Sequence, residues 1–194
     1  VGNKLVDTLS GQKTTLLKEA ERQLLEADKY DTRILLYTDA DYPQRLKNLP
    51  DSPYLIYHRG DTDLNTKKVV AIVGTRKATQ YGKDMTQSLV AEMKTYKPLI
   101  VSGLAYGIDI EAHRASLKND LPTIAVMASG MDTIYPAVHR ETAKKMLTKG
   151  GLITEESFGT KPDAFRFPAR NRIIAGMADV VVVVEAAEKG GALI

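Results

Sequence analysis

The fold is decided by residues 69–76, which read Val69-Val70-Ala71-Ile72-Val73-Gly74-Thr75-Arg76. Five apolar residues followed by glycine are typical of a strand that is buried on both faces and turns sharply at its carboxyl end. Such strands occur in parallel sheets that helices cover on both sides. This stretch therefore predicts the first strand of a parallel α/β sheet, with any ligand site beyond the carboxyl ends of the strands.

The sequence downstream of this strand alternates between strand and helix patterns. Apolar strands follow at 99–101, 123–127, 152–154 and 180–184, and helices at 80–96, 108–117, 136–149 and 171–177. The alternation predicts a Rossmann-like, doubly wound α/β fold with a mostly parallel sheet and helices on both faces.

The sequence upstream begins with a helical pattern. Leucines recur at near-helical spacing through residues 1–29, with an expected interruption at Ser10-Gly11. We expect residues 1–30 to form an N-terminal helical segment, part of a small helical domain. We expect residues 31–194 to form the Rossmann-like domain, which we expect to be truncated at its carboxyl end.

Residues 31–68 combine short strands with polar connections. Strands are predicted at 33–38 and 54–58, and a short helix opens at Tyr42-Pro43 with Asp41 as a candidate cap. The polar stretch 61–68 is interpreted as a linker and a boundary before the regular sheet.

Composition places the chain among globular proteins and excludes several functional classes. Of 194 residues, 43% are hydrophobic and 26% are charged, which argues against a disordered chain. The absence of cysteine excludes disulfides, thiolate metal sites and a cysteine nucleophile. No apolar run is long enough for a membrane helix and no secretory signal is visible, so we expect a cytoplasmic protein. Because the chain starts at Val1 and stops at Ile194 within a pattern, we expect a piece of a longer protein.

Charge is distributed unevenly along the chain. Residues 1–66 carry nine basic and eleven acidic side chains, whereas residues 67–194 carry eighteen basic and thirteen acidic ones. A basic body predicts an anionic partner such as a nucleotide, a phosphate or a nucleic acid, although charges scattered over a solvated surface would give the same balance.

Two loops at expected carboxyl ends of strands are candidates for anion binding. Gly74, Thr75 and Arg76 follow the first strand, and their amides and guanidinium would face the crevice. The second loop contains Ser102, Gly103 and Gly107, whose small side chains leave backbone amides open to a phosphate. Neither loop fits a dinucleotide-binding fingerprint or a Walker A motif.

The second loop leads into a helix that carries Asp109 and His113 on one face. This pair is either an oriented histidine beside a phosphate cradle or a structural contact at a capped helix. The three histidines lack metal-ligand spacing and no nucleophile elbow is present, so we expect no catalytic set, no metal and no cofactor.

The third candidate segment combines arginines with an aromatic residue. It contains Arg166, Phe167, Arg170, Asn171 and Arg172. Arginine makes bidentate phosphate contacts and phenylalanine offers a stacking face, which together suit single-stranded nucleic acid. The alternative is structural, with Phe167 in the core and the polar side chains bracing neighbouring loops.

Taken together, these segments resemble the DNA-processing protein A family, also called Smf or DprA. The resemblance covers residues 35–194. It rests on motifs in a fixed order: Ile72 to Arg76, Ser102 to His113, Gly130-x-Asp132-x-x-Tyr135-Pro136, Phe167-Pro168-x-Arg170-Asn171-Arg172 to Gly176, and Val182 to Ala186.

The resemblance implies an extended Rossmann fold that binds single-stranded DNA without a catalytic step. It also implies a homodimer that protects incoming DNA and loads the RecA recombinase during natural transformation. Two alternatives remain. One is an enzyme similar to nucleotide phosphoribohydrolases, whose Pro-Gly-Gly-x-Gly-Thr loop is absent here apart from a weak similarity at Gly190-Gly191. The other is a nucleotide sensor that uses the same crevice.

Overall fold

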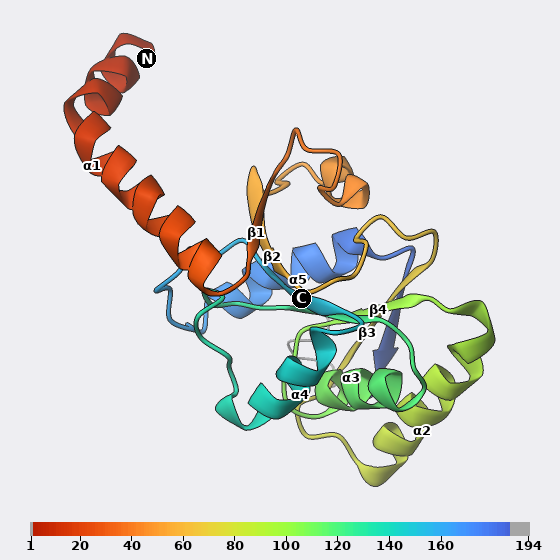
Figure 1. The fold of residues 1–194 in the computed structure, drawn as a ribbon. Helices are drawn as coiled ribbons and strands as arrows, with labels where there is room; N and C mark the ends of the chain where they lie inside the picture. Colours follow the sequence, from red (N-terminus) through yellow and green to blue (C-terminus); the bar gives the residue numbers. More distant parts are fainter. Residues whose placement is uncertain (1, 187–194) are drawn as a thin grey trace.

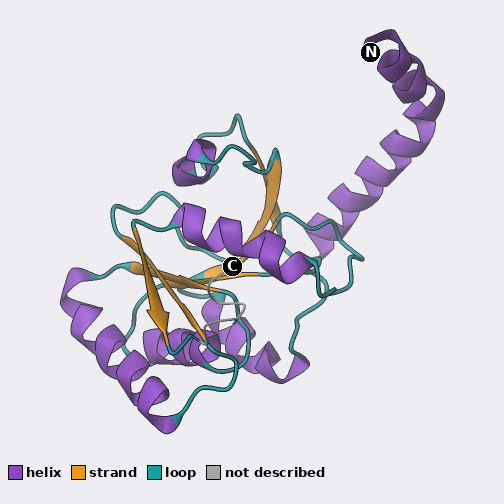
Figure 2. Ribbon diagram, turned by 180° about the vertical axis from the view of Figure 1, so that it is seen from behind, coloured by secondary structure: helices purple, strands orange, loops and turns teal. Residues whose placement is uncertain are grey.

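The structure, a computed structural model, describes residues 2–186 and contains a seven-stranded sheet with helices on both sides (Figures 1 and 2). The strand order is β1-β2-β6-β5-β4-β3-β7. The strands are β1 (Arg33–Leu36), β2 (Leu55–Arg59), β3 (Val69–Gly74), β4 (Leu99–Ser102), β5 (Thr123–Val126), β6 (Gly151–Thr154) and β7 (Val180–Val184).

Five strands, β3 to β7, run parallel, and β1 and β2 add an antiparallel edge. The predicted α/β class is thereby confirmed. The predicted boundary at residues 61–68 is wrong, because β2 pairs with β6 and places Tyr57 opposite Thr154. This polar segment connects two strands of one sheet.

Helices cover the two faces unequally. The first face packs against α2 (Gln80–Glu92), α3 (Ile108–Lys118) and α4 (Arg140–Met146), and the second against α5 (Arg166–Met177). Short 3-10 turns are η1 (Gln44–Asn48), η2 (Met93–Tyr96) and η3 (Ala137–His139).

Two helices differ from the sequence prediction. The segment expected to be helical over 136–149 is a 3-10 turn followed by the seven-residue α4. Helix α5 begins at Arg166, five residues before the predicted start at Asn171. Pro168 does not prevent this early start, since proline is tolerated in the first helical turn, where the missing N–H has no intrahelical partner.

Alternate residues of each central strand face opposite helical layers, as strand geometry requires. In β3, Val69 and Ala71 pack with α5 residues such as Ile173, whereas Ile72 packs with Ile108 of α3. All five are buried almost completely. Burial on both faces explains why the strand reads as a continuous apolar run.

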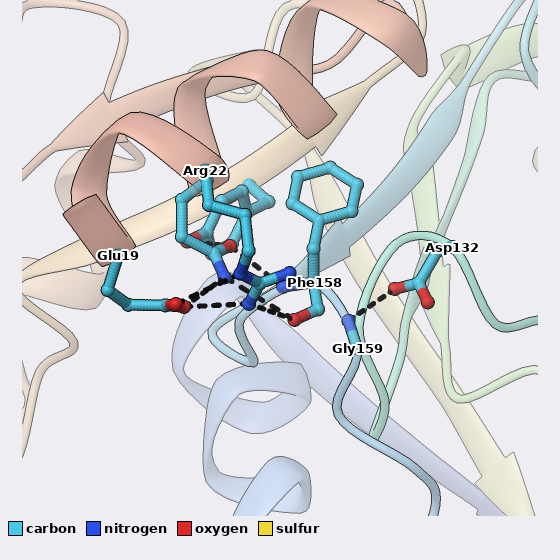
Figure 3. Close-up of polar contacts among 7 residues, drawn as sticks. Glu19, Arg22, Asp132, Phe158 and Gly159 are labelled. Carbon is cyan, nitrogen blue, oxygen red and sulfur yellow. Dashed lines mark hydrogen bonds and ion pairs between the residues drawn. The ribbon is translucent and has the colours of Figure 1, made fainter.

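Helix α1 (Gly2–Lys29) projects away from the sheet and is attached to it near its carboxyl end (Figures 1 and 3). Gln23 accepts from the backbone N–H of Phe158 at 2.9 Å and from the Tyr57 hydroxyl at 3.0 Å, while Arg22 donates to the Phe158 carbonyl oxygen. The expected interruption at Ser10-Gly11 is wrong, because the helix runs through both residues.

Candidate nucleic-acid interface

A cavity of about 730 Å³ lies at the carboxyl edge of the parallel strands. It opens between the ends of β3 and β7 and the first turns of α5. From β3 the chain crosses one face of the sheet through α2 to β4, whereas β7 is reached across the other face through α5. The chain therefore leaves β3 on one face of the sheet and enters β7 from the other. Open α/β sheets bind ligands at such a switch point. Lining residues include Gly74, Thr75, Arg76, Tyr135, Phe167 and Asn171.

The rim of this cavity holds a cation and two aromatic rings. Arg76 is exposed, and its guanidinium carbon lies 5.0 Å from the ring centre of Phe167. The Phe167 ring, which is partly exposed, is 5.8 Å from that of Tyr135. A cation–π contact of this kind keeps the guanidinium near the ring while leaving its N–H groups open to solvent. The rim therefore offers an anion contact and a flat apolar face side by side.

The floor of the cavity contains a buried charge network. Arg170 is 5% exposed and donates to the carbonyl oxygens of Gly103, at 2.8 Å, and Val126. Asp109 is buried beside it and accepts from the Gly103 N–H at 3.1 Å. Burial raises the pKa of Asp109, while the Arg170 charge opposes that rise. Burial lowers the pKa of Arg170 to about 10, which leaves it charged at neutral pH.

Glycines allow the two anion-binding loops to pack against each other. Gly107 has φ of +77°, in the region that favours glycine, and a β-carbon there would collide with the Thr75 carbonyl oxygen. That oxygen accepts from the Ile108 N–H at 3.2 Å, and the Thr75 N–H donates to the Glu185 carbonyl oxygen at 2.9 Å. The backbone before Arg76 is thus held from both sides.

The remaining predicted residues are placed away from the rim. Ser102 and Gly103 are buried, and the Ser102 hydroxyl donates to the Ile72 carbonyl oxygen at 2.6 Å. Arg166 pairs with Glu156, and Arg172 pairs with Asp51 and Glu155. The guanidinium groups of Arg166 and Arg172 therefore brace loops beside the cavity.

The oriented-histidine interpretation of Asp109 and His113 is wrong. His113 is fully buried, with its Nδ1 2.7 Å from the Thr123 hydroxyl, and burial lowers its pKa to about 3. Both residues share a helix face as expected, but that face packs into the core. Their hydrogen bonds go to different partners, so each residue is structural, but no hydrogen bond in the described part of the chain joins the two as a pair.

Tyr135 was not among the residues predicted for the site. The sequence indication for Tyr135 is the Tyr135-Pro136 pair in the segment after β5, which pairs with β4. Gly190-Gly191, which weakly resembles the glycine-rich loop of nucleotide phosphoribohydrolases, lies outside the described residues. Within residues 2–186, no group of histidine and carboxylate side chains could hold a metal ion, and no helix is long and apolar enough to cross a membrane.

These features define a class: a Rossmann-like α/β protein with a crevice at the sheet switch point, rimmed by one exposed arginine and two aromatic rings. The profile of the family described as DNA recombination-mediator protein A matches residues 33–194. The chain belongs to this family, as its sequence motifs predicted.

Named relatives agree with this assignment. DNA processing protein DprA of Bacillus subtilis is 42% identical over 79% of this chain and 52% of its own length, and Protein Smf of Synechocystis is 37% identical over 100% of this chain and 49% of its own. The chain spans about half the length of these relatives.

Solved structures show the same fold. DNA processing protein A from Streptococcus pneumoniae superposes with a TM-score of 0.80 at 34% identity, covering 87% of this chain and 60% of that one. A structure of the Helicobacter pylori protein that concerns its single-stranded DNA binding mode gives a TM-score of 0.75 at 32% identity, covering 84% and 73%.

Proposed function

We propose that the carboxyl-edge crevice binds single-stranded DNA and that the chain is the DNA-binding part of a recombination mediator. The observation that carries the proposal is the contact between Arg76 and Phe167 at the rim. A guanidinium binds a phosphate through charge-assisted hydrogen bonds, and an aromatic ring stacks on any base. The two groups lie close enough to contact one nucleotide unit.

The surrounding charges favour Arg76 as the phosphate contact. Arg166 and Arg172 are neutralised by carboxylates, and Arg170 is buried on the floor. Among the ion pairs between residues 2 and 186, none involves Arg76. We assign Gly74, Gly103, Gly107, Ser102 and Arg170 to the framework that positions the rim, and Thr75, Arg76, Phe167 and Asn171 to the DNA contact.

The proposal extends to the whole protein through its family membership. We propose that it acts without a catalytic step in the cytoplasm, protects incoming DNA, forms a homodimer and loads RecA during natural transformation. Family membership supports this proposal. Filament assembly by RecA on single-stranded DNA, measured with and without the whole protein, tests the loading step.

A competition experiment tests the binding proposal. A labelled oligothymidylate is titrated with this chain, and unlabelled oligonucleotide, duplex or mononucleotide is then added. We expect the single strand to displace the label far more effectively than mononucleotides do. Equal displacement by a mononucleotide would indicate a nucleotide sensor, and cleavage of it would indicate an enzyme. Arg76→Ala should weaken binding, and Arg114→Ala, which removes an exposed arginine from α3, serves as the matched control.

A further inference from the structure

The amino edge of the sheet, opposite the crevice, carries a row of lysines that the proposed function does not use. Each of four neighbouring parallel strands is preceded by at least one of them. The row, together with one aromatic residue, consists of Lys67, Lys68, Lys94, Tyr96, Lys97, Lys118 and Lys149, all of them exposed. We call this set the amino-edge face.

Strand pairing brings these lysines together. Val69 lies opposite Leu99, Ile100 opposite Thr123, and Ile124 opposite Gly151, so the segments before β3, β4, β5 and β6 lie side by side. Adjacent strands are about 4.8 Å apart, which sets a close spacing between the entering segments. The row is therefore a property of the sheet itself.

Charge on this face is only partly balanced. Asp120, an acidic residue among these lysines, forms an ion pair with Lys149. Asp179, at the same edge, is paired with Arg45. The hydrogen bond from Lys149 lowers the pKa of Asp120, and the charges of Lys94 and Lys97 lower it further. Three lysines thus lower the pKa of this one carboxyl group. Cations gathered in this way repel one another, and a polyanion relieves that repulsion.

The face also contains an exposed aromatic ring. Tyr96 is 65% exposed, and the Lys68 Nζ lies 5.4 Å from its ring centre. The Lys68 carbonyl oxygen accepts from the Leu99 N–H at 2.9 Å, and Arg45 donates to the carbonyl oxygens of Thr66 and Lys67. The backbone that carries Lys67 and Lys68 is thus held by hydrogen bonds within the protein.

We propose that the amino-edge face is a second contact surface for single-stranded nucleic acid, separate from the crevice. Aligned lysines match the regular charges of a phosphate backbone, and an exposed ring beside them offers a stacking face. The two surfaces are separated by the length of the strands, roughly 20 Å for six residues. A short DNA strand in the crevice therefore leaves the amino-edge face free, whereas a long DNA strand, or a second DNA molecule, contacts it.

Two matched triple variants test this surface. Lys94→Gln, Lys97→Gln and Lys118→Gln together remove three charges from the face, while Lys13→Gln, Lys18→Gln and Lys29→Gln remove three exposed charges from α1. Each is titrated with oligothymidylates of about 5 and about 40 nucleotides, within and beyond the size of a single binding groove. Their melting temperatures are measured alongside.

We expect the amino-edge variant to bind the short strand like the parent. For the long strand, loss of three phosphate contacts reduces the log–log salt slope by about 2, which corresponds to up to about 100-fold weaker binding near 0.1 M salt. Equal losses in the two triple variants, or unchanged long-strand binding, would overturn the proposal. Arg76→Ala, by contrast, should weaken the binding of both the short and the long oligonucleotide. A failure of the crevice proposal is therefore recognised separately.

Tyr96→Ala separates nucleic acid from other polyanions. Base stacking predicts a loss of roughly 5- to 150-fold for the long single strand. Inorganic polyphosphate, which has no bases, should bind this variant like the parent. Tyr54→Ala, at a tyrosine that is 87% exposed elsewhere, is the control. Identical losses for polyphosphate and DNA would contradict a stacking role and overturn the assignment to nucleic acid.

Discussion

Arg170 and Arg76 carry the same guanidinium group at one crevice, but in opposite environments. Arg170 on the floor is buried, bonded to two backbone carbonyl oxygens and close to a buried carboxylate. Arg76 on the rim is exposed and rests against an aromatic ring. The difference teaches that burial and existing partners, rather than residue type, separate charges that hold the fold from charges that are available to a ligand.

The floor should respond to mutation mainly through stability. Arg170→Ala leaves Asp109 buried without its compensating charge and two carbonyl oxygens without their donor. We expect the free energy of unfolding in urea to fall by about 3–5 kcal/mol. Arg114→Ala, which removes an exposed arginine paired with Glu111, should cost about 0–1 kcal/mol. Unchanged stability of Arg170→Ala together with lost DNA affinity would move Arg170 to the binding surface.

The rim should respond mainly through binding. Arg76→Ala removes one charge-assisted phosphate contact, and we expect the free energy of single-stranded DNA binding to weaken by about 1.5–3 kcal/mol. The side chain is exposed, so the melting temperature should stay at that of the parent. Fluorescence anisotropy and thermal unfolding on one sample check both quantities, and an unchanged affinity would leave Arg76 a surface residue.

Phe167 lies between the two extremes, since it is partly exposed. Phe167→Ala should weaken binding of every homopolymer by a similar amount, about 1–3 kcal/mol, because each base has a stacking face. Phe167→Trp should keep most of the affinity. If Phe167 were fully buried, Phe167→Ala would instead lower the free energy of unfolding by about 3–5 kcal/mol. A large fall in melting temperature with DNA affinity preserved below it would return Phe167 to the core.

Lowering the pH should reduce the stability of the interior gradually while leaving DNA binding at the rim almost unchanged, and this effect is smaller than those of the mutations. Burial lowers the pKa of His113 to about 3 and that of His58 to about 4, both from 6.5. The unfolded chain binds these protons below pH 6.5 while the native state does not, so the free energy of unfolding falls as pH falls.

Between pH 6.5 and 5, we expect each histidine to contribute a slope that approaches about 1.4 kcal/mol per pH unit. Urea denaturation across this range measures the total, and His113→Gln should remove one share of it. The affinity for DNA at the rim should change little over the same range, because Arg76 stays charged. An unfolding free energy independent of pH would contradict the buried, neutral state of these histidines.

Local sequence patterns predicted the elements that depend on local forces. The apolar run 69–73 and the glycine after it predicted a strand buried on both faces, which is the position of β3. The glycines of the loop from Gly103 to Gly107 were predicted to leave backbone amides open to a phosphate, but Gly107 packs against the Thr75 loop and the Gly103 N–H donates to Asp109. For β3 the constraint lies within a few neighbouring residues, whereas Gly107 and Thr75 are 32 positions apart and meet only through the fold.

Long-range pairing could not be predicted from the same patterns. Arg172 looked available, but its partner Asp51 is 121 positions earlier in the sequence and reaches it only through the fold. Helical periodicity placed Asp109 and His113 on one face without showing that this face is buried. The polar composition of 61–68 indicated a linker, yet the pairing of β2 with β6 joins both sides of it into one sheet.

The salt dependence of single-stranded DNA binding tests the central claim most directly, when it is measured for the parent, Arg76→Ala and Arg114→Ala. If Arg76 at the rim neutralises one phosphate, Arg76→Ala should reduce the log–log slope by about 0.7, while Arg114→Ala should match the parent. The unfolding midpoint should be the same for the parent and Arg76→Ala. Equal slopes for the parent and Arg76→Ala would contradict the assignment of the rim to DNA.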